Sequence, residues 1–409
     1  MILKNLKVSN KEENLKISVE VESKNEKKEL WFSVPKKYEE GICKDQYDSF
    51  LVGMLYPAME LGENILIKGK VSSKLLFNIN NYIIPLICSF SNKVKKIKVE
   101  AEEISYKNYA GTGVGTGFSG GVDSFSTVYD HYELEKDKKH KINSFLFLNV
   151  GSHGNGDEKE VYSKFMKRYD FLKKFPEEIG LEFIPVNSNL YKFHPWGHQL
   201  THTLTSVSGI LILQKKYCKY YYASAGLSYI ESFKFFEEWL EHDIGIFDPI
   251  LLSLLSTESL ELVSDGIQYT RVEKVKNIIN YEPVSRYLNV CVSGEDTHEN
   301  CSVCSKCCRT LMTLDSLGKI EEFSSLFDIK KYRKEAERRY LAEQVLNQDK
   351  NAYARDNVEL AKINNKLLPS KFTSIVILFP NILKKFIIEK IWLKLSIGTR
   401  KKIKKILGK

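Results

Sequence analysis

Two features of exported and membrane proteins are missing from this sequence. The first residues, MILKNLKVSN, contain neither a long apolar run nor a small-residue cleavage site, so they do not resemble a signal peptide. The apolar run TSIVILF before Pro380 is far shorter than the roughly 18 residues that span a bilayer. We therefore expect a cytoplasmic protein without a transmembrane helix.

Net charge is missing from most of the chain. The 409 residues include 61 Lys and Arg against 52 Asp and Glu, which gives a formal charge of +9. Residues 381–409 hold ten of these bases and one acid, Glu389, so the preceding 380 residues are balanced at 51 of each sign. This balance argues against a nucleic-acid surface spread over the protein, and nucleic acid is the less favoured partner.

The basic tail, residues 381–409, has an amphipathic pattern. Its apolar residues recur at helical spacing beside lysines, at Phe386, Ile387, Ile391, Trp392 and Leu395. The pattern is typical of a helix lying on an anionic membrane surface, which would place the protein at the inner membrane face. A helix that binds an acidic protein partner would show the same pattern. A solvated basic helix stays open because Lys is common throughout this chain.

Hydropathy patterns divide the chain into three segments. Residues 1–105 read mainly as strands, with a helix expected at DQYDSFLVGMLYPAMEL, and predict a β-rich α+β accessory domain. Residues 106–325 alternate short apolar runs with amphipathic stretches. Residues 326–409 read as a helical region that ends in the basic tail.

The alternation in residues 106–325 predicts an α/β fold. Strands that are apolar on both faces indicate a parallel sheet with helices on both sides, and the expected strands are GVGTGF, NSFLFLNV, LEFIPVN and KYYYASA. Ligands of such sheets bind at the carboxyl ends of the strands. The turns after Phe118, Val150, Val186 and Ala225 therefore form the predicted wall of the site.

A glycine-rich turn, FSGGVDS, follows the first of these strands. The amides that open the next helix have no intrahelical partners, and the helix dipole is positive there, so this turn predicts a phosphate or pyrophosphate site. Glycine allows close approach of the anion at Gly120 and Gly121, and hydroxyl donors come from Ser119 and Ser124. Asp123 is expected to engage Mg²⁺ or a ligand hydroxyl. The lysine of a Walker loop is absent.

The motif SGGVDS resembles the pyrophosphate loop (PP-loop) of the ATP pyrophosphatase superfamily, also described as adenine nucleotide α-hydrolase-like. The resemblance implies a HUP-type sheet and cleavage of ATP between the α and β phosphates, which activates a substrate as an adenylate. It also implies that Ser119, Gly120, Gly121, Val122, Asp123 and Ser124 bind the nucleotide, with Asp123 and Ser124 in catalytic roles.

Four cysteines are spaced for a metal. CVSGEDTHENCSVCSKCC places Cys291, Cys301, Cys304 and Cys307 in a C-x9-C-x2-C-x2-C pattern, and two-residue gaps let thiolates share one tetrahedral Zn²⁺. Cys308 could replace Cys307. An iron–sulfur cluster held by three of the cysteines is the alternative.

A pyrophosphate loop followed by this cysteine pattern resembles the 7-cyano-7-deazaguanine synthase family over roughly residues 112–320. The resemblance implies four zinc-binding cysteines, carboxylate activation by ATP and attack by ammonia. STESLELVSDGI, residues 256–267, lies where the family has a helix before its zinc loop. The chain has NVGSHGNGDE where the family carries Tyr-Gly-Gln-Arg-His, so the acceptor is left open.

These patterns predict an ATP-dependent ligase or amidotransferase that adenylates a carboxylate-type small molecule for attack by ammonia or an amine. His153 follows the second expected strand and is a candidate catalytic residue that contacts the substrate or ATP. His198 and His202 could line the pocket or hold a metal, although a polar helix start is favoured. A tRNA sulfurtransferase and a non-catalytic nucleotide-binding module at the membrane are the alternatives, and a homodimer is left open.

Overall fold

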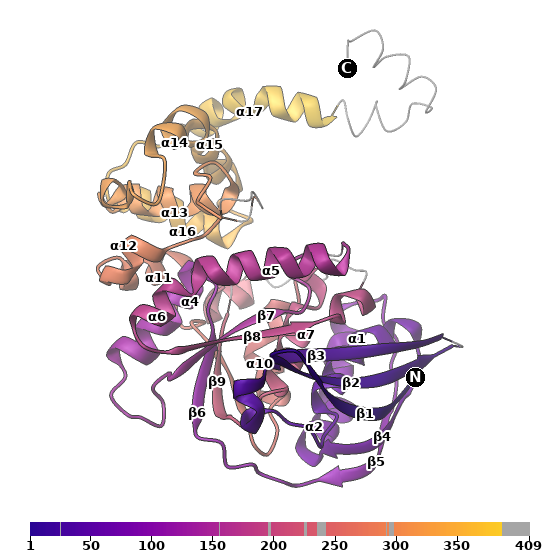
Figure 1. Cartoon of the computed structure of the whole chain (residues 1–409). Coiled ribbons are helices and arrows are strands. Elements are labelled where there is room, and N and C mark those ends of the chain that lie inside the picture. Colours follow the sequence, from indigo (N-terminus) through magenta and orange to yellow (C-terminus); the bar gives the residue numbers. More distant parts are fainter. Residues whose placement is uncertain are drawn as a thin grey trace. The chain divides into compact units, whose positions relative to one another are not determined.

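A computed structural model describes residues 1–386 except residues 25, 155, 195–197, 225–226, 235–242, 292 and 294–297. The side chains of residues 198 and 381–386 also lie outside the description. The chain forms two compact units: residues 1–290 with 294–299, and residues 291–293 with 300–409 (Figure 1). None of the described helices is both long and apolar enough to cross a membrane.

The first unit is an α/β structure built on one ten-stranded sheet with the order β10-β9-β6-β7-β8-β3-β2-β1-β4-β5. Most neighbouring strands are parallel; the antiparallel pairs are β1–β2, β2–β3 and β3–β8. The strands are β1 (Ile2–Lys11), β2 (Asn14–Ser23), β3 (Glu26–Pro35), β4 (Ile65–Ser72), β5 (Val99–Ser105), β6 (Gly113–Gly117), β7 (Ser144–Asn149), β8 (Glu182–Ser188), β9 (Tyr217–Ala223) and β10 (Glu261–Asp265).

Helices cover both faces of the central parallel strands. On β7, Phe147 stacks on Phe165 of α5 with ring centroids 5.1 Å apart, whereas Leu148, the next residue, lies against Gly209 of α7. Because successive strand residues point to opposite faces, α5 and α7 lie on opposite sides of the sheet. The helices of this unit include α1 (Asp48–Leu61), α2 (Ser73–Asn78), α3 (Ile84–Phe90), α4 (Val122–Val128), α5 (Glu158–Leu172), α6 (Lys174–Glu178), α7 (His202–Leu211), α8 (Tyr229–Lys234), α10 (Asp248–Leu254), α11 (Arg271–Ile278) and α12 (Glu282–Tyr287).

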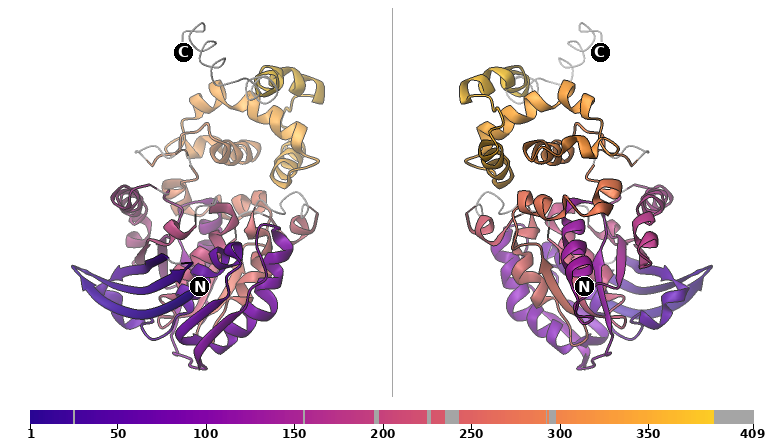
Figure 2. Two further views of the ribbon diagram at one scale, coloured as in Figure 1. Left: turned by 90° about the vertical axis from the view of Figure 1, so that its right-hand side faces the viewer. Right: turned by 90° about the vertical axis from the view of Figure 1, so that its left-hand side faces the viewer.

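The N-terminal strands continue the same sheet. β3 pairs antiparallel with β8, and Figure 2 shows the indigo N-terminal strands at one end of the sheet. The carbonyl of Trp31 accepts a hydrogen bond of 2.7 Å from Ser188 Oγ, and Asn189 Nδ2 donates to the Glu29 carbonyl at 2.8 Å. The helix expected over residues 45–61 is α1, and it packs against α7. The domain boundaries expected at residues 105 and 325 stay predictions.

One expected helix is a strand. Residues 256–267 were expected to form the helix before the cysteine loop, but residues 261–265 form β10, which pairs with β9 from Glu261–Lys219 to Asp265–Ala223. Leu262 is 2% exposed and Asp265 is 5% exposed. Continuous parallel pairing with β9 therefore makes this segment a strand, and the helix implied by the family resemblance is wrong here.

The second unit is helical. α15 packs against both α16 and α17, and α13 packs against α16. Buried Thr313 of α13 donates a hydrogen bond of 2.7 Å to Asn357 of α16, which ties these two helices together. The helices are α13 (Ser305–Ser316), α14 (Ile329–Glu335), α15 (Glu337–Asn347), α16 (Ala352–Ile363) and α17 (Lys371–Phe386).

Candidate nucleotide site and metal centre

The glycine turn lies at the point of the sheet where the order of the strands reverses. Along the chain the central strands run β6, β7, β8, β9 and β10, but β6 lies between β7 and β9. Crossovers leave β6 and β9 toward opposite sides, and ligands of open α/β sheets bind in the crevice at the carboxyl ends of two such strands. The turn after β6 and the residue Ser224 after β9 border this crevice.

The turn has a backbone that favours glycine. Gly120 has φ +74°, and a Cβ placed there would lie 2.9 Å from Leu172 Cδ2. Gly121 is the N-cap of α4 and has extended backbone, φ −82° and ψ 172°. Ser124 donates to the Gly121 carbonyl at 3.0 Å, and its Oγ lies 3.3 Å from Ser119 Oγ. The six residues assigned to nucleotide binding thus form one short turn with Val122, which is 1% exposed, as its apolar anchor.

Two residues distant in sequence hold this turn. The Asn289 amide donates to the Gly120 carbonyl at 2.7 Å, and Arg168 of α5 donates to the Ser119 carbonyl at 3.2 Å. Arg168 also donates to Asn289 Oδ1 at 2.7 Å. The carbonyls of Ser119 and Gly120 are therefore bonded by residues from outside the turn.

Asp123 binds two cations of α11. Arg271 Nη2 lies 2.8 Å from Asp123 Oδ2, and Lys274 Nζ lies 3.0 Å from Oδ1. Lys274 also donates to the Ser224 carbonyl at 2.8 Å, and its side chain is 1% exposed. Two cations thus converge on one carboxylate at the mouth of the turn, an arrangement that can accept an anionic ligand.

Sequence analysis missed these two cations, although a local signal existed. TRVEK begins with a capping box, in which Thr270 and Glu273 hydrogen-bond each other's backbone amides, and this box fixes the start of α11. Arg271 and Lys274 are three residues apart and therefore share a helix face. Their distance from Asp123 in the sequence, however, hides the contact.

A second layer of polar contacts connects α4 to β10. Asp265 at the end of β10 accepts hydrogen bonds from Thr127 at 2.5 Å and contacts His131 Nε2 at 2.7 Å. The His131 ring stacks on Tyr221 with centroids 3.8 Å apart. Burial, reinforced by the charge of Asp265, raises the pKa of Asp130 to about 6. These contacts fix the orientation of α4, and with it the direction of its amides.

A small cavity opens beside Ser224. Its lining includes Asp243, whose Oδ1 lies 2.9 Å from His202 Nε2, and His202 Nδ1 lies 3.1 Å from the Tyr222 hydroxyl. The Asp243 contact raises the pKa of His202 against the opposing effect of burial. Burial raises the pKa of neighbouring Asp248 to about 7. The cavity is lined by Ser224, Leu227, Ser232, Asp243, Gly245, Ile246 and Ile267.

Two further polar residues stand at the carboxyl ends of β7 and β8. Asn149 Nδ2 donates to Asn187 Oδ1 at 2.7 Å, and Asn149 is 1% exposed. The buried Asn149 Oδ1 has no hydrogen-bond partner among the described residues. Sequence analysis placed the end of this strand in the site wall but did not single out Asn149, which is a candidate contact for a bound molecule.

His153 lies on the turn after β7. Its ring packs edge-on against Phe147 and Phe165, with centroid distances of 5.3 Å to each, and its Nδ1 lies 3.1 Å from Ser152 Oγ. Its role as a substrate or ATP contact stays a prediction. The Ala225 turn, the His198 side chain and residues 387–409 of the tail lie outside the described residues.

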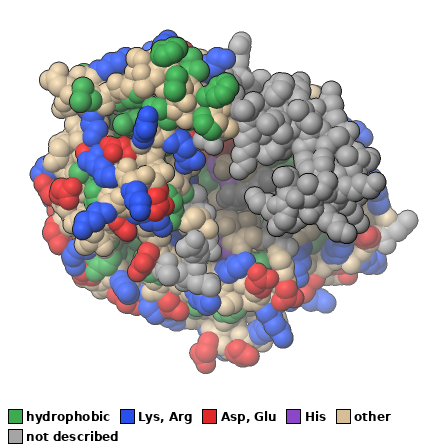
Figure 3. All heavy atoms as spheres, turned by 90° about the horizontal axis from the view of Figure 1, so that it is seen from above, with side chains coloured by type: hydrophobic (Ala, Val, Ile, Leu, Met, Phe, Trp, Pro, Cys, Tyr) green, Lys and Arg blue, Asp and Glu red, His purple; other side chains and the backbone are tan. Residues whose placement is uncertain are grey.

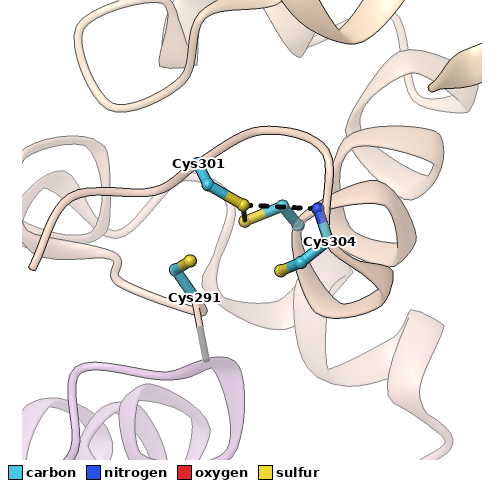
Figure 4. A group of neighbouring side chains, drawn as sticks. Cys291, Cys301 and Cys304 are labelled. Carbon is cyan, nitrogen blue, oxygen red and sulfur yellow. Dashed lines mark hydrogen bonds between the residues drawn. The ribbon is translucent and has the colours of Figure 1, made fainter. Parts of the chain in front are cut away.

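The predicted metal ligands come together in the second unit. The sulfurs of Cys291, Cys301, Cys304 and Cys307 all lie within 4.8 Å of one another, and Figure 4 shows three of these side chains converging from a loop and the start of α13. Cys301 Sγ and Cys307 Sγ are 4.0 Å apart. Four sulfurs at about 2.3 Å from a tetrahedral Zn²⁺ would be roughly 3.8 Å apart, so the group is compatible with zinc.

Two thiols of the cluster differ in pKa: burial and the neighbouring Cys304 raise the pKa of Cys307, whereas the pKa of Cys301 is lowered. Although burial opposes it, hydrogen bonds from the backbone of Val303 and Cys304 and from neighbouring side chains lower the pKa of Cys301 to about 6. The Cys304 amide lies 3.3 Å from Cys301 Sγ. Cys308 is not part of the group: it is 1% exposed and its thiol faces the Ser302 carbonyl at 4.0 Å. Cys307 rather than Cys308 is the fourth member of the cluster.

Comparison with models of protein families, with curated protein sequences and with solved structures gave no match.

Proposed function

We propose that the protein is an ATP-dependent ligase that adenylates a carboxylate-bearing small molecule and transfers the acyl group to ammonia or an amine. One observation carries the proposal: a glycine turn at the junction of β6 and β9 ends in Asp123, to which Arg271 and Lys274 bring two cations. The resemblance of SGGVDS to a pyrophosphate loop supports the same function.

The residues have distinct roles in this proposal. Amides at the start of α4 and the hydroxyls of Ser119 and Ser124 bind the β and γ phosphates. Arg271 and Lys274 stabilise negative charge on the departing pyrophosphate. Asp123 would hold Mg²⁺, which supplies further charge stabilisation when bound. When ATP and Mg²⁺ bind together, Asp123 would contact the metal in place of its two cationic partners. Arg271 and Lys274 would then contact the phosphates.

The proposed reaction has two steps. A carboxylate oxygen of the acceptor attacks the α-phosphorus of ATP, the bond to the bridging oxygen breaks, and pyrophosphate leaves. Ammonia or an amine then attacks the acyl carbon, loses a proton, and AMP leaves. The crevice at the carboxyl ends of β6 and β9 is the proposed acceptor site, because the Ser224 carbonyl that Lys274 contacts follows β9 at this point.

Zinc in the cysteine cluster would be structural. Four thiolates complete a tetrahedral shell and leave no position for a substrate. This closed arrangement favours a ligase over a tRNA sulfurtransferase. A sulfur carrier needs an accessible free thiol, whereas the four clustered sulfurs lie within 4.8 Å of one another and Cys308, outside the cluster, is 1% exposed. The zinc would tie Cys291 and Cys301 to the start of α13.

The test is the product of ATP turnover. Purified protein is incubated with ATP, Mg²⁺ and the small-molecule fraction of a cell extract, with hydroxylamine added as a trapping amine. We expect AMP and pyrophosphate, and we expect both to be lost in Ser119→Ala and Asp123→Asn. Ser253→Ala is the matched control, since its hydroxyl bonds an exposed carbonyl at the end of α10.

Other products would decide against the ligase. ADP and phosphate would exclude adenylation. Tight ATP binding without turnover in any extract fraction would favour a nucleotide-binding module in which Asp123 and the two cations act only as a clamp.

A further inference from the structure

Helix α17 has an exposed apolar face. Phe372, Ile375, Val376 and Phe379 are 77%, 48%, 55% and 57% exposed. Their spacing of three, four and seven residues from the first places them on one side of the helix. Such a continuous row differs from the isolated apolar residues found on any protein surface, and it indicates a partner.

The opposite side of α17 is occupied. Ser374 is 0% exposed and Leu378 is 8% exposed, and α17 packs against α15. The helix is therefore anchored to its own unit through one side while the apolar row faces outward. Leu367, just before the helix, is 91% exposed and extends the apolar surface. Figure 3 shows hydrophobic side chains gathered on this side of the molecule with Lys and Arg beside them.

Charge identifies the partner. The sequence directly after the apolar row, residues 381–409, has ten Lys and Arg and one acid. Exposed aromatic and aliphatic side chains next to a polybasic segment are the two components by which a surface helix binds an anionic bilayer. A second copy of the chain would bring an equal positive charge to the same place, which opposes self-association through this face.

We infer that α17 is a membrane-docking helix. It lies in the headgroup region of an anionic phospholipid bilayer with Phe372, Ile375, Val376 and Phe379 turned toward the acyl chains, while the basic residues that follow attract the lipid phosphates. This inference is independent of the proposed ligase activity, because it uses only the helical unit and the tail sequence.

Vesicle flotation with the full-length protein tests the inference. We expect wild type to float with vesicles of phosphatidylcholine and phosphatidylglycerol at low salt, and to stay at the bottom with pure phosphatidylcholine. In Phe372→Ser/Phe379→Ser we expect the partition coefficient to fall by about tenfold or more, because two aromatic side chains no longer insert. High salt should weaken binding of the wild type.

The matched control removes two rings with the same exposures from the other unit. Phe77 and Tyr106 are 57% and 77% exposed, so Phe77→Ser/Tyr106→Ser should float like wild type. Circular dichroism and thermal unfolding establish that both double variants are folded. Absence of wild-type binding, equal binding to neutral vesicles, or unchanged flotation of the α17 variant would overturn the inference. A dimer that dissociates in Phe372→Ser/Phe379→Ser would instead assign this face to a second copy.

Discussion

The contact between Lys274 and Asp123 gives the sharpest prediction. In Lys274→Met the apolar side chain fills much of the same volume but removes a buried ammonium group. Asp123 Oδ1 and the Ser224 carbonyl, now 3.0 and 2.8 Å from Nζ, both lose their donor. Breaking a buried ion pair by removing one partner costs about 3–5 kcal/mol. Since Arg271 still neutralises Asp123, we expect a loss near the lower end, about 3 kcal/mol of the free energy of unfolding.

A double-mutant cycle separates the pair from its surroundings. Asp123→Asn alone leaves Lys274 buried beside a neutral amide, whereas Lys274→Met/Asp123→Asn removes both charges. The double variant should therefore lose less free energy of unfolding than the sum of the losses in the two single variants. The difference, which is the coupling energy, should be about 1.5–3 kcal/mol. Urea unfolding followed by tryptophan fluorescence measures this, since Trp31 lies in the same unit as the pair.

The same variants test the role of the pair in ATP binding. If Lys274 contacts the phosphates, Lys274→Met weakens ATP binding by about tenfold or more, as expected for a charge-assisted hydrogen bond. A coupling energy below about 0.5 kcal/mol would show that the pair is not formed. Unchanged ATP affinity in a folded Lys274→Met protein would refute its assignment to the phosphate site.

Three further changes have defined outcomes. Gly120→Ala places a Cβ on a backbone with φ +74° and against Leu172, so we expect loss of ATP binding in a titration and a lower unfolding temperature. Gly318→Ala is the control for backbone strain alone, because its φ is +70° and its Cβ would meet nothing within 4 Å. Cys304→Ser should lower bound zinc, measured by elemental analysis, from one per chain to well below one, whereas Cys88→Ser should not. Burial raises the pKa of Asp48 to about 6, so between about pH 4 and pH 6 the folded protein keeps a proton that the unfolded chain has released. The free energy of unfolding of the wild type, relative to Asp48→Asn, should therefore fall by about 3 kcal/mol as pH rises through that window and stay level above it. Urea unfolding at several pH values measures this difference.

Features encoded within a few residues could be predicted from the sequence. The turn from Ser119 to Ser124 has its glycines and hydroxyls in direct succession, and the close spacing of Cys301, Cys304 and Cys307 determines which sulfurs can meet. The central strands were also visible, because each is a short apolar run between polar turns. In all these cases the chemistry and the geometry lie in the same stretch of chain.

Contacts between distant segments could not be predicted. Lys274 reads as an ordinary helix lysine among many, and only the fold turns it under Ser224 and toward Asp123. Asn289 likewise has no motif, although its amide holds the Gly120 carbonyl. Segment 261–265 was misjudged because the expected helix rested only on the position of a helix in the resembled family, whereas here the segment pairs with β9. Long-range pairing decides each of these positions.

The single sheet changes how the N-terminal segment relates to the site. β3 pairs with β8 at Ser33 and Asn187, and Asn187 accepts the hydrogen bond of Asn149 at the carboxyl ends of the parallel strands. Without β3, the edge of β8 would present unpaired amides and carbonyls beside this Asn pair. The N-terminal strands therefore fix one wall of the crevice from outside, as Asn289 and Arg168 fix the glycine turn. Residues outside the candidate site thus determine where its polar groups lie.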